Sequence, residues 1–133
     1  MTTTQTAVVA VRARLEAAQY PWPVEVIDGA PTSTPAGPYI CIYDQTGRTI
    51  RRKYVGVGSG LYWPFQLSCV ARTTDALREL VNTARAAVLD WAPVDAASPI
   101  VEDGSNPVLT TGVGNDQRLT APLTMHSYLP KET

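Results

Sequence analysis

Apolar residues recur every three to four positions in two segments of the chain, residues 6–19 and 74–89, which is the spacing of an amphipathic helix. The second segment follows two threonines that can cap a helix N-terminus, and Asp75 suits the positive end of the helix dipole. We therefore predict two helices. Their apolar positions are Val8, Val11, Leu15 and Ala18 in the first, and Leu77, Leu80, Val81, Ala84 and Val88 in the second.

Other segments have the composition or alternation of β-strands. Residues 24–27 (VEVI) are predicted to form a short strand, and residues 38–43 (PYICIY) are apolar on both faces, which favours a central strand. The stretch LYWPFQLSCVAR alternates strictly from Phe65 to Val70. Residues 118–129 also alternate, but Pro122 interrupts them and favours an edge strand or a bulge.

Turn and loop residues separate these segments. Residues 28–38 hold three prolines and two glycines and predict a surface loop. Residues 44–47 (DQTG) predict a turn, after which residues 48–57 pair back as a hairpin. Residues 98–117 are rich in glycine and proline and predict loop excursions.

The order of elements is helix, three or four strands, helix, then one or two strands. This order predicts an α+β fold, a mainly antiparallel sheet of four to five strands with both helices packed on one face. A length of 133 residues suits one domain, so we expect residues 1–133 to form a single unit.

The chain has few charged residues, and they are unevenly distributed along it. Charged residues make up 17% of the chain, against about 25% in typical proteins, and the net charge of −1 creates no general attraction for polyanions. Basic residues cluster in mid-chain, whereas acidic residues dominate after residue 89, an asymmetry that suits docking against a second copy. The acidic group is Asp90, Asp95, Glu102, Asp103, Asp116 and Glu132, against Arg118 and Lys131.

Residues with catalytic potential have structural explanations. His126 is the only histidine, and in a strand of mixed polarity it is expected to be half-exposed and structural. Cys41 and Cys69 lie at apolar strand positions without a nearby base or metal-ligand spacing, so we expect buried free thiols. Glu102 and Asp103 would face opposite ways in a strand. We predict no enzymatic activity, no cofactor and no metal site, and the absence of a long apolar run predicts no membrane segment.

One cluster combines basic and aromatic residues within the predicted hairpin at 44–63. Such residues bind nucleic acid through phosphate contacts and stacking, but the same types are enriched in protein interfaces. Three interpretations remain open: a solvated hairpin face, a protein contact, and direct nucleic-acid binding. The candidate interface residues are Arg48, Arg51, Arg52, Lys53, Tyr62 and Trp63.

The element order resembles that of the tail terminator (minor tail) proteins of long-tailed bacteriophages. The segments that carry the resemblance are the N-terminal helix, PWPVEVIDG, GPYICIYD, WPFQLSCVAR leading into TTDALRELVNTARAAVLDW, and RLTAPLTMHSYLP. The strand followed by the threonine-capped helix contributes most. Small proteins of the phage neck, such as head-closure or adaptor proteins, share much of this organisation and form the alternative.

The resemblance implies a structural virion protein, made in the host cytoplasm and located in the tail or neck. Its members form a homohexameric ring that caps the tail tube, ends tube growth and joins the tail to the head-side connector or stopper protein, with DNA only passing through the lumen. A closed ring needs a heterologous contact, and the basic mid-chain against the acidic C-terminal third is a candidate pair.

Overall fold

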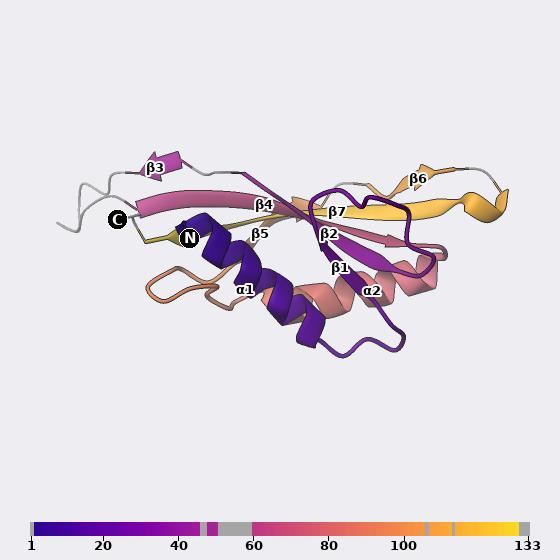
Figure 1. The fold of residues 1–133 in the computed structure, drawn as a ribbon, viewed down its shortest axis with the longest axis horizontal. Helices are drawn as coiled ribbons and strands as arrows, with labels where there is room; N and C mark the ends of the chain where they lie inside the picture. The colour runs from indigo at the N-terminus through magenta and orange to yellow at the C-terminus, as the bar shows by residue number, and fades with distance from the viewer. Residues whose placement is uncertain (1, 46–47, 51–59, 106, 113, 131–133) are drawn as a thin grey trace.

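The computed structural model describes residues 2–45, 48–50, 60–105, 107–112 and 114–130. Two helices, α1 (Thr3–Ala17) and α2 (Thr74–Val88), lie on one face of a mainly antiparallel sheet (Figure 1). The predicted α+β class is confirmed, but the described part of the sheet has seven strands, not four to five. These are β1 (Glu25–Asp28), β2 (Tyr39–Asp44), β3 (Arg48–Ile50), β4 (Gly60–Ala71), β5 (Val101–Ser105), β6 (Leu109–Thr111) and β7 (Arg118–Leu129), with a 3₁₀ turn at Gly114–Asp116.

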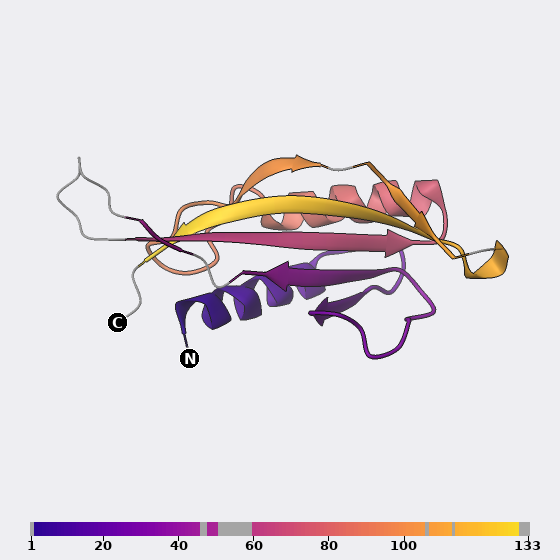
Figure 2. The same ribbon diagram turned by 90° about the horizontal axis from the view of Figure 1, so that it is seen from above.

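Two strands of 12 residues each, β4 and β7, form the centre of the sheet (Figure 2). The strand order is β1-β2-β4-β7-β5; β3 also pairs with β4 and β6 with β7. All pairs are antiparallel except β1 with β2. The prediction that residues 38–43 form an internal strand is confirmed, since β2 lies between β1 and β4.

The prediction that residues 98–117 form only loop excursions is wrong, because this segment contains two of the strands. Residues 98–117 contain β5 and β6 because both pair with β7; β6 is exposed at every position and β5 is bulged, so neither has a period-two pattern. In the predicted hairpin, β3 pairs with the start of β4, and β2 pairs with a later part of β4. The shared edge of β4 therefore holds β2 and β3 end to end.

The prediction that residues 118–129 form an edge strand is wrong, because β7 is central and contains Pro122. Tyr128 accepts a bond from the Ser98 N–H at 2.9 Å, and its own N–H donates to Ser98 Oγ at 2.8 Å. The N–H and C=O of Tyr128 therefore point away from β4. Backbone groups alternate along a strand, so the nitrogen of Pro122, six residues earlier, points the same way. Neither β5 nor β6 has a residue registered with Pro122, so no ladder bond is lost.

Local capping explains where the helices begin. Thr2 and Gln5 form a capping box, with the Gln5 N–H donating to Thr2 Oγ1 at 3.2 Å and the Thr2 N–H to Gln5 Oε1 at 2.7 Å. This box starts α1 at Thr3, earlier than the predicted residue 6. Thr73 caps α2, since its Oγ1 accepts from the Ala76 N–H at 3.2 Å.

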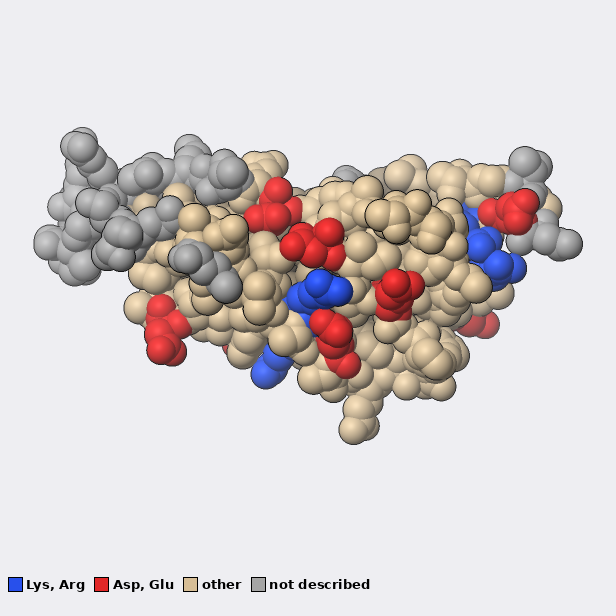
Figure 3. All heavy atoms as spheres, in the orientation of Figure 1, with Lys and Arg blue, Asp and Glu red and all other residues tan. Residues whose placement is uncertain are grey.

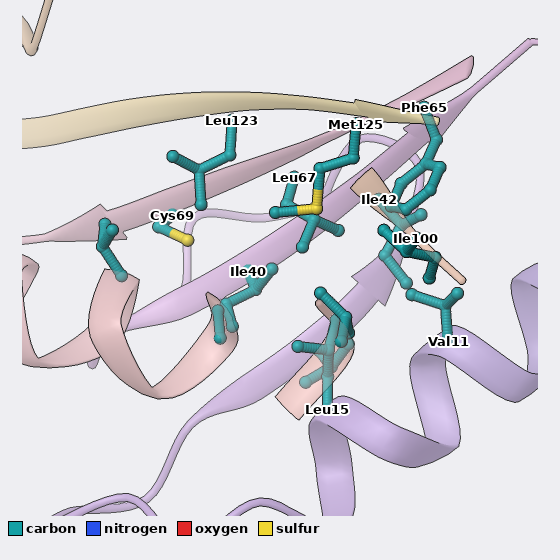
Figure 4. Close-up of a cluster of buried hydrophobic side chains, with 14 of the residues drawn as sticks. Val11, Leu15, Ile40, Ile42, Phe65, Leu67, Cys69, Ile100, Leu123 and Met125 are labelled. Carbon is teal, nitrogen blue, oxygen red and sulfur yellow. The ribbon is translucent and has the colours of Figure 1, made fainter. Parts of the chain in front are cut away.

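The hydrophobic core fills the space between the helices and the sheet face that they cover (Figure 4). The predicted apolar positions of α2 are all buried, as are Val8, Val11 and Leu15 of α1. Alternate residues of the central strands meet them. The sheet side of the core includes Ile40, Ile42, Phe65, Leu67, Cys69, Leu123 and Met125, with Ile100 from the segment before β5.

Candidate interaction surface

The opposite face of the sheet is covered by neither α1 nor α2 (Figure 2). Its central positions alternate with the core residues and carry aromatic, hydroxyl, amide, proline, thiol and aliphatic side chains, four of them buried, without Asp, Glu, Lys or Arg. This composition suits the central part of a protein interface, where charged residues are depleted. The central positions of this helix-free face are Tyr39, Cys41, Tyr43, Tyr62, Pro64, Gln66, Ser68, Val70, Thr120, Pro122, Thr124, His126 and Tyr128.

Several large apolar side chains on the helix-free face are exposed. Tyr43, Val101 and Leu109 are 41%, 50% and 55% exposed. Val101 is registered with His126, and Leu109 with Thr120, which places both on this face. Exposed apolar side chains on one face, rimmed by polar groups, mark a surface suited to contact with another protein.

Three rings cluster at one end of this face, and we call them the aromatic cluster: Tyr62, His126 and Tyr128. Tyr62 lies opposite Tyr128 across the β4–β7 pair, with ring centroids 5.5 Å apart. The His126 ring lies 5.3 Å from that of Tyr62 and 5.4 Å from that of Tyr128. Tyrosine is favoured in interfaces because its ring offers contact area and its hydroxyl a polar group.

A hydrogen bond to Asp103 fixes the histidine of the aromatic cluster. Nδ1 of His126 lies 2.6 Å from Oδ1 of Asp103, and a β-bulge between Glu102 and Gly104 accommodates Asp103. Because an ionised carboxylate can only accept, the ring donates an Nδ1–H to Asp103. His126 was predicted to be half-exposed and structural; its side chain is 16% exposed, more buried than predicted, and no sequence pattern indicated Asp103 as its partner.

Glu102 and Asp103 face opposite sides of the sheet, as predicted for strand residues. Glu102 lies on the helix side, where its Oε1 accepts a bond from Arg85 Nε of α2 at 2.9 Å. Asp103 binds His126 on the other side. Two members of the acidic group in the C-terminal third are therefore engaged within the chain, which weakens the idea that this group as a whole pairs with a neighbour's basic segment.

The structure places two of the candidate interface residues, Arg48 and Tyr62, on neighbouring strands and buries a third, Trp63. Arg48 belongs to β3 and is registered with Tyr62, while Arg51, Arg52 and Lys53 lie outside the described residues. Tyr62 is partly exposed on the helix-free face.

Trp63 is fully buried, at 0% exposure, so its side chain is no surface contact of the isolated chain. Its ring stacks on Phe65 with centroids 4.5 Å apart, and its indole N–H donates to Asp44 Oδ2 at 3.3 Å. The alternation of β4 directs Tyr62 outward and Trp63 inward.

Both cysteines are buried free thiols, as predicted, but they lie on opposite faces of the sheet. Cys69 is in the core, where burial raises its pKa to about 12. Cys41 is on the helix-free face, registered with Ser68, and desolvation raises its pKa too. At neutral pH both stay protonated and are poor nucleophiles.

Other candidate features are weak within the described part of the chain. No group of three or more His, Cys, Asp or Glu side chains is placed to hold a metal ion there. No described helix is long and apolar enough to cross a membrane. An open hollow of about 320 Å³ lies beside β1, lined by Arg12, Glu25, Asp28 and residues of the following loop.

Two solved structures share the fold of this chain. No family model and no curated protein matches the chain. A chain from the virion of a native gene transfer agent particle has a TM-score of 0.57 at 13% identity, with 98% of this chain and 92% of that chain covered. A second solved protein, which carries no functional description, has a TM-score of 0.57 at 20% identity and covers 96% of both chains. The fold is shared over nearly the whole chain.

Proposed function

We propose that this chain is a structural virion protein that forms a hexameric ring at the end of a phage tail tube. In this proposal the ring stops tube growth and joins the tail to the head-side connector, with DNA passing through its lumen. The observation that carries the proposal is the near full-length fold match to a chain of a gene transfer agent virion. That match supports a virion protein, and the position at the tail end rests on the resemblance of the element order to tail terminator proteins.

The helix-free face supplies the physical means of contact. Its central positions lack charges, and it exposes Tyr43, Val101 and Leu109, so little desolvation of charge opposes a protein partner there. Ordered β-strands hold these side chains in place, which lowers the entropy lost on binding. We assign this face to contact with the tube or connector.

The direct test is electron microscopy of the purified protein, alone and mixed with tail tubes that lack a cap. Rings, or caps at the tube ends, are expected. A protein that stays monomeric and binds no tube end would refute the proposal. Binding to the connector without binding to tube ends would instead support the alternative, another neck component.

A matched pair of substitutions tests the assigned face. Val101 on the helix-free face and Val9 on α1 are similarly exposed, at 50% and 57%. A glutamate in place of Val101 puts an unpaired charge into the contact, so V101E should weaken tube-end binding at least tenfold. V9E should leave binding unchanged. Equal behaviour of the two variants would remove the helix-free face from the proposal.

A further inference from the structure

We propose that two edge strands of the sheet, β6 of one copy and β1 of the next, join by strand addition between neighbouring copies. This inference rests on the proposed ring and deepens it by naming the contact. The two edges lie on opposite sides of the molecule (Figure 2). A contact between two different patches is heterologous, and repeated with the right rotation it closes a ring.

The outer edge of β6 presents backbone groups to a partner strand. Tyr128 shows that even-numbered residues of β7 face away from β4, so Thr120 and Arg118 bond toward β6. Their registered partners are Leu109 and Thr111. By alternation, the N–H and C=O of Thr110 face outward from the sheet.

The outer edge of β1 is arranged in the same way. The Glu25 N–H donates to the Pro38 carbonyl at 3.4 Å and the Gly29 N–H to the Ile42 carbonyl at 2.9 Å, so odd-numbered residues bond toward β2. The backbone groups of Val26 and Asp28 therefore face outward. The hollow of about 320 Å³ lies between β1 and the loop that follows it, and its lining includes Glu25, Asp28 and five residues of that loop.

The edge at β6 lacks the usual protection against strand addition. Residues 107–112 (PVLTTG) carry no charge, and Val108 and Leu109 are 53% and 55% exposed. An exposed, uncharged edge with β-branched residues is a template for pairing with another chain. A permanent neighbour in a ring would cover it.

The charges at the two edges are complementary. Acidic side chains gather over the α1–β1 side of the molecule (Figure 3), and β1 contributes Glu25 and Asp28. Beside β6, Arg118 is registered with Thr111; its guanidinium donates to the Gln117 carbonyl at 3.2 Å, and its Nε is buried without a partner among the described groups. With strands about 4.8 Å apart, Glu25 of an added β1 would lie two strand spacings from Arg118, within reach of the two long side chains.

A proline at Thr110 removes the outward donor of β6 without removing a ladder bond to β7. The variant T110P should raise the concentration needed for half-maximal ring assembly at least tenfold, measured by analytical ultracentrifugation and by native mass spectrometry. T110A keeps the N–H and should assemble as the wild type does. Circular dichroism and thermal unfolding of each monomer check that the fold is intact.

A charge swap between Glu25 and Arg118 tests the β1 edge. It also tests the contact between copies if T110P does not fold. E25K should weaken assembly, and the double variant E25K/R118E should restore it, which a merely structural effect would not do. Assembly unchanged in T110P, or no restoration in the double variant, would overturn the edge contact while leaving the ring itself standing. A wild-type chain that forms no ring alone or on tube ends would overturn both.

Discussion

Nδ1 of His126 lies 2.6 Å from Oδ1 of Asp103, and this contact ties the bulge of β5 to the central strand β7 on the helix-free face. The bond is partly shielded, because the side chains are 16% and 35% exposed. It also fixes the ring of His126 between Tyr62 and Tyr128.

The variant D103A should therefore lower the free energy of unfolding by about 1.5–3 kcal/mol, the usual range for losing a hydrogen bond to a charged group. Urea unfolding followed by tryptophan fluorescence measures it. D95A, which removes an exposed carboxylate in the loop after α2, should change stability by less than about 0.5 kcal/mol. Equal effects of the two variants would show that the Asp103 contact contributes nothing.

Substitutions at Trp63 and Tyr62, which are adjacent in β4, should affect different properties: folding stability for the first and binding for the second. W63A empties a fully buried site in the core and should cost about 3–5 kcal/mol of folding free energy. Y62A alters the partly exposed aromatic cluster and should cost about 1 kcal/mol, while weakening binding to tube ends. Denaturant titration measures the folding free energy, and co-sedimentation with tail tubes measures the binding; a larger folding loss in Y62A than in W63A would contradict the assigned faces.

The N-cap of α2 offers a test with a neighbouring control. T73A removes the oxygen that accepts from the Ala76 N–H and should destabilise the chain by about 1 kcal/mol. T74A, one residue further on in the exposed first turn, should be neutral or slightly stabilising because alanine favours helices. Thermal unfolding of both variants distinguishes the two threonines, and a reversed order would place the cap at Thr74.

Stability should fall at alkaline pH, partly through Cys69. Burial raises the pKa of this thiol from 9.0 to about 12, so the unfolded chain loses the proton first as pH rises. The stabilisation that the neutral Cys69 thiol contributes to the folded chain is complete below pH 9 and is lost as pH approaches 12. The stability of C69A should therefore depend less steeply on pH in this window, as measured by urea unfolding at several pH values.

Tyr20 also has its pKa raised by burial, to about 12, and contributes to the same alkaline limb in both proteins. The difference between wild type and C69A isolates the thiol. Identical slopes would mean that Cys69 ionises as easily in the folded chain as in the unfolded one. Alkylation by iodoacetamide provides a second readout, since modification of Cys69 should wait for opening of the core.

Sequence alone determined the local elements. The helical spacing of Leu77, Leu80 and Val88 predicted the buried side of α2, and Thr73 was one of the two predicted caps. The alternation along LYWPFQLSCVAR predicted β4 and its buried Phe65, Leu67 and Cys69. These features depend on residues close in sequence, whose side-chain directions the period of a helix or strand dictates.

Tertiary structure alone decided which strands meet. Pro122 could occupy a central strand only because its nitrogen lies at the break between β5 and β6, and no local pattern encodes that break. Trp63 became core because β4 continues its alternation through Pro64. Asp103 met His126 through pairing of β5 with β7, across 23 positions of sequence. Such contacts depend on strand register. Register is fixed by the burial of one whole face of the sheet, and a short sequence window does not contain that information.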